Sequence, residues 1–417
     1  MKIVLIQARF FNIWEALGLG YIGALAKQHL STQDRIEFYQ GYFDSDETIV
    51  AACRDAGVVG FSCTSPTFAH AQALARQIKS INPKAYCVFG GWHPSAMPDI
   101  SGQEGIDCVI IGEGDYAFSE VLQGRRESII CAAPVPDLNT LPFPDRELIK
   151  NHREIALAQK ITGRRITSFQ SIRGCPRNCA FCGEHAVSGK LTRHNPVRVR
   201  NPQHLMEEIS RVTREYALDY FKFVDPTWNV SEEHVLSFCQ EKLRVGNRLK
   251  WECNLHAATV TETMLSAMKQ AGCCQINIGC ESGSPRILRD MHKGITVDQV
   301  RQIFKWGRDI GLERRGYFLL GMPNETVEDI RLTEALIDDI QPDVVGITIL
   351  CPYPGSSLYA KYMKDKTVDW STTDEYTNDF WSTATLSNAE LKHWQAYLVS
   401  KYKRKAAWHN KALLELP

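Results

Sequence analysis

Three cysteines close together in the middle of the sequence are the residues best suited to metal chemistry. Cys175, Cys179 and Cys182 lie in the segment GCPRNCAFCGEH with the spacing C-x3-C-x2-C. Three thiolates on one short loop can hold three irons of a cubane iron–sulfur cluster, because soft sulfur ligands suit iron. This segment leaves the fourth iron without a protein ligand, and an open metal position can bind a substrate or cofactor.

A zinc site is the main alternative reading of these cysteines. Structural zinc takes four ligands, commonly as paired cysteines, and no second Cys-x2-Cys pair follows. His185 could complete a Cys3His site, so this alternative stays open. Most other cysteines of the 14 are expected to be small core residues, among them Cys63, Cys87 and Cys108 in or beside apolar runs, while Cys273, Cys274 and Cys351 near strand ends remain open.

The cysteine loop follows the first of six strands predicted in the second half of the chain. These are Ile166–Ile172, Tyr220–Val224, Lys250–Asn254, Gln275–Gly279, Arg315–Leu320 and Val344–Leu350, separated by helical patterns near 202–216, 231–243, 261–271, 296–310 and 326–338. Six β/α units are too few for an eight-stranded barrel and predict an open partial (β/α)6 barrel. Its active site would lie at the carboxyl ends of the strands.

The first 131 residues predict a separate doubly wound α/β domain of the flavodoxin-like (Rossmann-like) kind. Its predicted strands are Ile3–Gln7, Ile36–Gln40, Val58–Cys63, Tyr86–Phe89 and Cys108–Ile111, with helices near 18–30, 47–56, 68–80 and 115–123. Ligands of such folds bind beyond the carboxyl ends of the strands. No G-x-G-x-x-G stands directly after the first predicted strand, where a standard dinucleotide fingerprint would lie, and the sequence holds no G-x-x-x-x-G-K-[ST] P-loop.

A proline-rich stretch separates the two predicted domains. Residues 132–144 hold four prolines and cannot continue a helix or a central strand. The expected organisation is therefore a domain at 1–131, a linker at 132–160, a barrel at 161–358 and a small, mostly helical region at 359–417. In the last region the aromatic residues could shape a substrate site or pack helices, and the basic run KYKRK at 401–405 could be a solvated helix face.

Composition narrows the location and the partners. The 417 residues carry 48 basic and 48 acidic side chains, which disfavours a nucleic-acid partner held by a bulk basic field. No signal peptide and no apolar run of about 18–20 residues is found. We therefore expect a cytoplasmic chain with reduced cysteines and no membrane partner. The compact C-terminal region, which shows no peptide-recognition domain, favours a small-molecule substrate over a long peptide.

The cysteine motif and its place after the first barrel strand resemble the radical S-adenosylmethionine (SAM) superfamily, over about 165–355. Phe181, before the last cysteine, also matches. The resemblance implies a 4Fe–4S cluster held by Cys175, Cys179 and Cys182, whose open iron binds SAM. It further implies SAM contacts at Asp225, at Glu281 and Ser282, and at Gly321, Met322 and Pro323, each after a strand. Taken singly, Glu281 could cap a helix and Asp225 could form a turn.

The loops of the first domain resemble the cobalamin-binding domain that precedes the barrel in one large radical SAM subfamily. The matching segments are ALGLGYIGALAKQ at 16–28, SCTSPTF at 62–68, GGWHPSAMP at 90–98 and IGEGD at 111–115. The implied cobalamin contacts are Ser62, Thr64, Ser65, Pro66, Gly90, Gly91, Trp92, His93, Gly112, Glu113 and Gly114. The Asp-x-His-x-x-Gly motif that supplies a cobalt ligand is absent, so we expect His93 to order its loop or touch the nucleotide tail. The alternative is a degenerate domain without cofactor.

The combined resemblance implies a cobalamin-dependent radical SAM methyltransferase. One SAM would methylate reduced cobalamin, and a second would be cleaved to a 5′-deoxyadenosyl radical. The substrate radical would then take the methyl group from methylcobalamin. An external electron donor of the flavodoxin or ferredoxin type is implied as well. Rearrangement, cyclisation or oxidation with the same cofactors is the alternative outcome, and a non-catalytic sensing module is a further, less favoured class.

Overall fold

Alternating side chains along the first strands build a parallel sheet that is buried on both faces. The computed structural model describes residues 1–10, 14–188, 197–374 and 378–403, but not the side chains of His185 and Ser188. Two aromatic residues of the last region, Tyr376 and Trp408, and the last two residues of its basic run, Arg404 and Lys405, lie outside the described residues. The six-stranded sheet has the order β2-β1-β3-β4-β5-β6, which confirms the predicted doubly wound class and adds one edge strand.

The described chain divides into two compact units. The first comprises Met1–Thr167, Cys182–Arg200 and Tyr353–Ser371. Its elements are β1 (Lys2–Gln7), α1 (Leu17–Lys27), β2 (Arg35–Gln40), α2 (Asp46–Ala52), β3 (Val58–Ser62), α3 (Ser65–Ile81), β4 (Tyr86–Gly90), α4 (Trp92–Ala96), η1 (Pro98–Ile100), β5 (Cys108–Ile111), α5 (Gly114–Leu122), β6 (Ile129–Cys131), η2 (Leu138–Thr140), α6 (His152–Thr162), α7 (Glu184–Ser188), β9 (Arg198–Val199), α14 (Ser357–Tyr362) and η4 (Trp370–Thr372), whose last residue belongs to the second unit.

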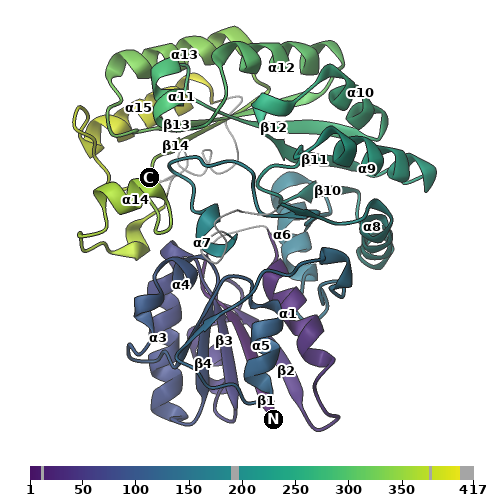
Figure 1. Cartoon of the computed structure of the whole chain (residues 1–417), viewed down its shortest axis with the longest axis vertical. Helices are drawn as coiled ribbons and strands as arrows, with labels where there is room; N and C mark the ends of the chain where they lie inside the picture. The colour runs from purple at the N-terminus through teal and green to yellow at the C-terminus, as the bar shows by residue number, and fades with distance from the viewer. Residues whose placement is uncertain (11–13, 189–196, 375–377, 404–417) are drawn as a thin grey trace. The chain divides into compact units, whose positions relative to one another are not determined.

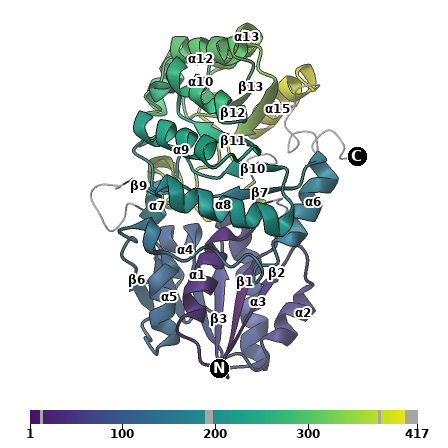
Figure 2. The same ribbon diagram turned by 90° about the vertical axis from the view of Figure 1, so that its right-hand side faces the viewer.

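Helices cover both faces of this first sheet (Figures 1 and 2). On one face Val4, Ile6 and Phe61 are fully or almost fully buried against α2 and α3. On the other face Ile3 and Leu5 are fully buried against α1 and α5. Successive residues of a strand point to opposite faces, so both faces of the sheet are apolar and the carboxyl edge is left for a ligand.

The second unit contains the partial barrel. It comprises Ser168–Phe181, Asn201–Pro352 and Thr372–Pro417, of which residues 375–377 and 404–417 are not described. Its elements are β7 (Ile166–Phe169, which crosses the boundary), β8 (Ile172–Arg173), α8 (Pro202–Tyr216), β10 (Tyr220–Phe223), α9 (Glu232–Arg244), β11 (Lys250–Leu255), η3 (Ala257–Thr259), α10 (Glu262–Gln270), β12 (Cys273–Glu281), α11 (Pro285–Asp290), α12 (Val297–Asp309), β13 (Glu313–Leu320), α13 (Val327–Ile340), β14 (Val344–Ile349) and α15 (Asn388–Lys401).

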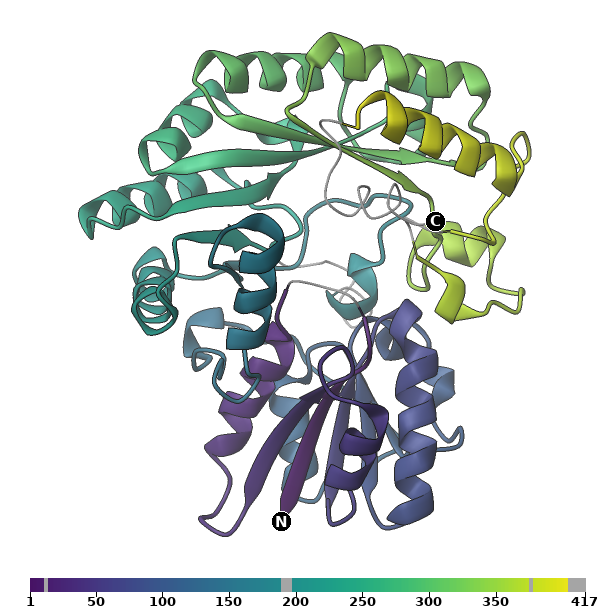
Figure 3. The same ribbon diagram turned by 180° about the vertical axis from the view of Figure 1, so that it is seen from behind.

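Six parallel strands in sequential order form the second sheet, β14-β13-β12-β11-β10-β7, as the sequence predicts (Figure 3). Aromatic side chains fill the layer between this sheet and its covering helices. Trp228, Trp251 and Phe238 are fully buried, and the rings of Trp228 and Trp251 lie 5.0 Å apart. Burial of such large side chains fixes the strands and therefore the loops at their carboxyl ends.

The predicted domain boundaries remain a prediction. Each compact unit is made of three separate segments of the chain, so the units cannot be compared directly with domains that are continuous in sequence. The stretch expected as a linker holds η2 and most of α6. Among the described residues, no helix is both long enough and apolar enough to cross a bilayer.

Candidate functional site

The loops predicted to bind cobalamin follow three adjacent strands of the first sheet. Ser62 ends β3, Gly90 ends β4, and Gly112 follows β5. Because β3, β4 and β5 are parallel neighbours, all eleven predicted residues lie at one edge of the sheet. At this edge Thr64 is exposed and the indole of Trp92 is 42% exposed, so both can contact a ligand.

Gly91 is required where the loop after β4 turns back over β3. Its φ is +97°, and a Cβ there would lie 2.8 Å from the carbonyl oxygen of Cys63. Cys63 N–H donates to the carbonyl of Gly90 at 3.1 Å. The two strand ends are therefore held together by backbone contacts that leave no room for a side chain.

His93 is an internal residue of this edge. It is 1% exposed, its ring stacks on Phe68 at 4.4 Å between centroids, and its Nδ1 lies 3.0 Å from the hydroxyl of Ser65. Burial lowers the pKa of His93 to about 4, so the imidazole is neutral at physiological pH. These contacts support the predicted ordering role.

Two other predicted residues are already engaged by the protein. The carboxylate of Glu113 accepts from both terminal nitrogens of Arg198, at 2.5 and 3.0 Å, and from the backbone N–H of Val135 at 2.9 Å. Gly112 N–H donates to Ser95 Oγ at 3.0 Å. In this structure Glu113 therefore fastens the loop after β5, and its contact with cobalamin remains a prediction.

Asp225, after β10, holds the start of the cysteine loop in the second unit. Its Oδ1 accepts from the backbone N–H groups of Ser171 and Ile172 at 2.9 Å each, and its Oδ2 accepts from Ser171 Oγ at 2.5 Å. The residue is fully buried. The carboxylate thus positions the segment that leads into Cys175, and a contact with the SAM amine remains a prediction.

Glu281 and Lys293 form an ion pair beside the cysteine loop. A register shift at the end of β12 accompanies the positive φ of Glu281, +60°. Glu281 Oε1 accepts from Lys293 Nζ at 2.6 Å, and that ammonium lies 5.6 Å from the ring centre of Phe181. Gly279 makes room for the pair, because a Cβ there would lie 2.5 Å from Glu281 Oε1.

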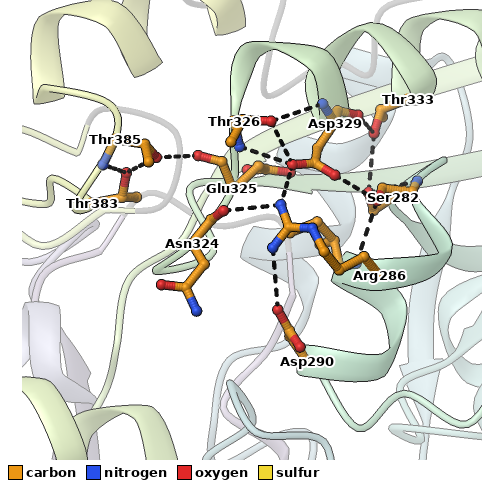
Figure 4. A network of polar contacts seen from close by, with 12 residues as sticks. Ser282, Arg286, Asp290, Asn324, Glu325, Thr326, Asp329, Thr333, Thr383 and Thr385 are labelled. Carbon is orange, nitrogen blue, oxygen red and sulfur yellow. Dashed lines mark hydrogen bonds and ion pairs between the residues drawn. The ribbon is translucent and has the colours of Figure 1, made fainter.

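Ser282 belongs to a buried polar network at the start of α11 and α13 (Figure 4). Its hydroxyl lies 3.1 Å from Thr333 Oγ1 and accepts from the N–H of Ser284 at 3.1 Å. Asp329 accepts from Ser284 Oγ at 2.6 Å and pairs with Arg286. The hydroxyl of Ser282 is fully buried, so the structure gives it a positioning role, and its predicted SAM contact stays untested.

The stretch Gly321–Pro323 is tied to the segment that precedes α15. Gly321 has φ +94°, its carbonyl accepts from Trp381 Nε1 at 2.7 Å, and its N–H donates to Glu325. Ala384 N–H donates to the carbonyl of Pro323 at 3.2 Å. Hydrogen bonds to Trp381, Glu325 and Ala384 therefore fix this backbone stretch, which is predicted to contact the adenine.

The cysteines offer the right donor chemistry for an iron–sulfur cluster. Cys175 and Cys182 are partly exposed, and burial raises the pKa of the Cys179 thiol. A bound metal stabilises the thiolate against this effect. Among the described residues, no group of three or more His, Cys, Asp or Glu side chains is arranged as a metal site. The fit therefore rests on the donor set, three thiols on one loop.

Comparisons with known proteins cover both units. The radical SAM superfamily profile matches residues 169–337, and the B12-binding domain profile matches residues 3–122. The chain belongs to the cobalamin-binding radical SAM superfamily. Its cofactors are accordingly a 4Fe–4S cluster, SAM and cobalamin.

Similar proteins agree with this assignment. An uncharacterised methyltransferase of Pyrococcus horikoshii is 28% identical over 94% of this chain and 86% of its own length. An anaerobic magnesium-protoporphyrin IX monomethyl ester cyclase of Rubrivivax gelatinosus is 24% identical, over 72% of this chain and 58% of the relative, so the chain spans little more than half of that protein. The solved structure of the radical SAM methyltransferase TsrM from Kitasatospora setae has a TM-score of 0.73 at 14% identity, covering 97% of this chain and 90% of TsrM.

Sequence reasoning missed Lys293 and Trp381 in this cobalamin-binding radical SAM enzyme. Lys293 follows α11 rather than a strand, so the pattern of polar residues after strands does not include it. Trp381 was one of several aromatics in the C-terminal region, and its hydrogen bond to Gly321 spans 60 residues. Only tertiary structure distinguishes it from residues that pack helices.

Replacing Trp381 with Phe is expected to weaken SAM binding several-fold. The variant keeps the aromatic ring but removes the donor to the Gly321 carbonyl, a loss of about 1 kcal/mol for a buried hydrogen bond. Equilibrium dialysis with SAM measures the effect. Trp394→Phe is the matched control, because Trp394 on α15 packs edge-to-face against Tyr397 of the same helix and under Arg331 of α13, and among the described residues it makes no hydrogen bond to Gly321. Equal affinities of the two variants would contradict the positioning role.

Replacing Glu325 with Gln is expected to remove a pH dependence of stability. Burial raises the pKa of Glu325 from 4.5 to about 8. Between these values the folded state holds a proton that the unfolded state releases, so the free energy of unfolding falls as pH rises. The loss is complete above the folded pKa and amounts to about 5 kcal/mol. Thermal unfolding of Glu325→Gln should match wild type near pH 4.5 and exceed it above about pH 8. A wild-type excess at the higher pH would contradict the assignment.

Proposed function

We propose that this chain methylates an unactivated carbon of a small molecule. The observation that carries the proposal is the presence, in one chain, of two parallel sheets whose carboxyl edges each present the residues expected for one cofactor. When bound, the cluster and SAM supply a carbon-centred radical, and cobalamin supplies a methyl group. A relative and a solved structure that are both named methyltransferases support this outcome.

The protein's own part in this reaction is positioning. Asp225 holds the start of the cysteine loop through four hydrogen bonds to Ser171 and Ile172. Lys293 places a positive charge beside Phe181 and Glu281, and Trp381 fixes the Gly321 carbonyl. Fixed groups of this kind lower the entropy that the bound reactants must lose. Radical formation from SAM consumes an electron, for which we propose an external flavodoxin- or ferredoxin-type donor in a cytoplasmic setting.

Cyclisation or rearrangement with the same cofactors is the second candidate. It is favoured by the similarity to the anaerobic ester cyclase, although the chain covers 58% of that protein. The two outcomes differ in whether a methyl group from SAM enters the product.

Isotope labelling distinguishes the two candidates. Cells that express the chain or its Cys179→Ala variant are grown anaerobically with methionine deuterated in the methyl group, and their metabolites are compared by mass spectrometry. Methylation predicts a metabolite that carries the labelled methyl and is absent with the variant. A chain-dependent product without label would contradict methylation and support cyclisation or rearrangement.

A further inference from the structure

We propose that Arg315, on the inner face of the second sheet, binds an oxyanion of the substrate, a carboxylate or a phosphate group. The inference rests on the proposed function and specifies its substrate class. Arg314 and Arg315 are neighbours on β13, so their side chains point to opposite faces of the sheet. Arg314 faces the helices, because its Nη1 donates to the carbonyl of Phe304 on α12 at 3.4 Å and its Nη2 pairs with Asp343 at 2.8 Å.

The inner face that receives Arg315 is polar, in contrast to the aromatic outer face. Strand register places Asn254, Asn277 and Arg315 side by side on β11, β12 and β13. Glu252 accepts from Tyr220 at 3.0 Å and lies 3.7 Å from Lys222 Nζ. The other polar groups therefore satisfy one another, as Gln275 and Asn277 also do at 2.7 Å.

Arg315 is the exception on this face. Its Nη1 donates to Tyr317 OH at 3.3 Å, while its Nε is buried and has no partner among the described residues. No ion pair within 4.0 Å joins the guanidinium to a carboxylate of the described residues, although the charges of Glu252 and Glu313 attract it at longer range. Arginine keeps its proton when it is partly buried, so the buried Nε without a hydrogen-bond partner is a donor that a ligand can satisfy.

The position of Arg315 and Tyr317 on β13 favours the substrate over SAM as the source of the oxyanion. The predicted SAM contacts follow the strand ends, whereas Arg315 lies inside β13, five residues before Leu320. Tyr317 is in register with Gly279, which borders the Glu281–Lys293 pair. The planar fork of the Arg315 guanidinium suits carboxylate and phosphate groups, and the hydroxyl of Tyr317 beside it can donate a further hydrogen bond.

Anion binding without turnover tests the proposal. The reconstituted chain is titrated with sodium phosphate and with sodium acetate against sodium chloride of equal ionic strength, and thermal unfolding is followed. We expect saturable stabilisation by phosphate or by acetate, which identifies the oxyanion. Arg315→Gln should weaken the binding at least about tenfold, and Arg315→Lys should weaken it less.

Arg314→Gln is the matched control. It removes a neighbouring guanidinium from the opposite face, so it should lower stability while retaining the anion affinity. Retained affinity in Arg315→Gln, or no saturable stabilisation of wild type by either anion, would overturn the proposal. Loss of SAM binding in Arg315→Gln, measured by equilibrium dialysis, would overturn the assignment to the substrate. Anion binding and SAM binding are both measured without methyl transfer, so they test the oxyanion site even if the proposed methylation is wrong.

Discussion

A Cys179→Ala variant is expected to lose both the iron–sulfur cluster and the cleavage of SAM. Each of the three cysteines supplies the only protein ligand that this loop offers to one iron, so removal of one leaves two ligands for a cluster that needs three. After anaerobic reconstitution, iron and sulfide content and the release of 5′-deoxyadenosine report the two losses.

The exposed Cys131, on the edge strand β6, provides the control for the cluster variant. Cys131→Ala should retain full iron content and SAM cleavage, because this thiol is not part of the C-x3-C-x2-C motif. If Cys179→Ala kept wild-type iron content and cleavage, the assignment of the motif as the cluster site would be wrong.

A Gly91→Ala variant is expected to lose cobalamin while the barrel keeps its cluster. The φ of +97° with ψ of −164° lies in a region open essentially to glycine alone, which costs about 1–3 kcal/mol for alanine. The added Cβ would also approach the Cys63 carbonyl oxygen to 2.8 Å, so the loop must move. Together these effects correspond to a loss of roughly tenfold or more in cobalamin affinity.

Gly102, in the turn between η1 and β5, gives a matched control for the cobalamin variant, since it also has a positive φ, +80°, and a Cβ at that position meets nothing within 4 Å. Gly102→Ala and Gly91→Ala are loaded with cobalamin, passed through a desalting column, and compared by the absorbance of the retained corrinoid. Equal retention by the two variants would show that the loop after β4 does not shape the cobalamin site.

Strongly patterned elements could be predicted from sequence to the residue. The apolar run Cys108–Ile111 and the amphipathic segment 202–216 have the bounds of β5 and α8. Helix α3 begins three residues earlier than predicted, at Ser65, because Thr64 and Thr67 form a capping box and Pro66 stands in the first turn. Thr64, Pro66 and Thr67 are thus residues in the sequence that mark the true start of the helix.

Other features could not be predicted because they depend on distant parts of the chain. Strand β6 has three residues and pairs with β5 at the edge of the sheet. A run of three residues is too short for its apolar pattern to predict a strand. Helix α6 lies in a segment whose prolines indicated a linker. Of the site, the strand-end loops were predicted in the correct order, whereas the Glu281–Lys293 pair and the Trp381–Gly321 contact arise only from folding.

One anaerobic experiment with purified protein tests the central claim, that this chain uses both a cluster-bound and a cobalamin-dependent reaction of SAM. The reconstituted chain is incubated with a reductant and with SAM deuterated in its methyl group, and the products are quantified by mass spectrometry. The account predicts 5′-deoxyadenosine and S-adenosylhomocysteine together, with the labelled methyl group in the extracted corrinoid. Formation of 5′-deoxyadenosine alone, with no label in the corrinoid, would contradict it.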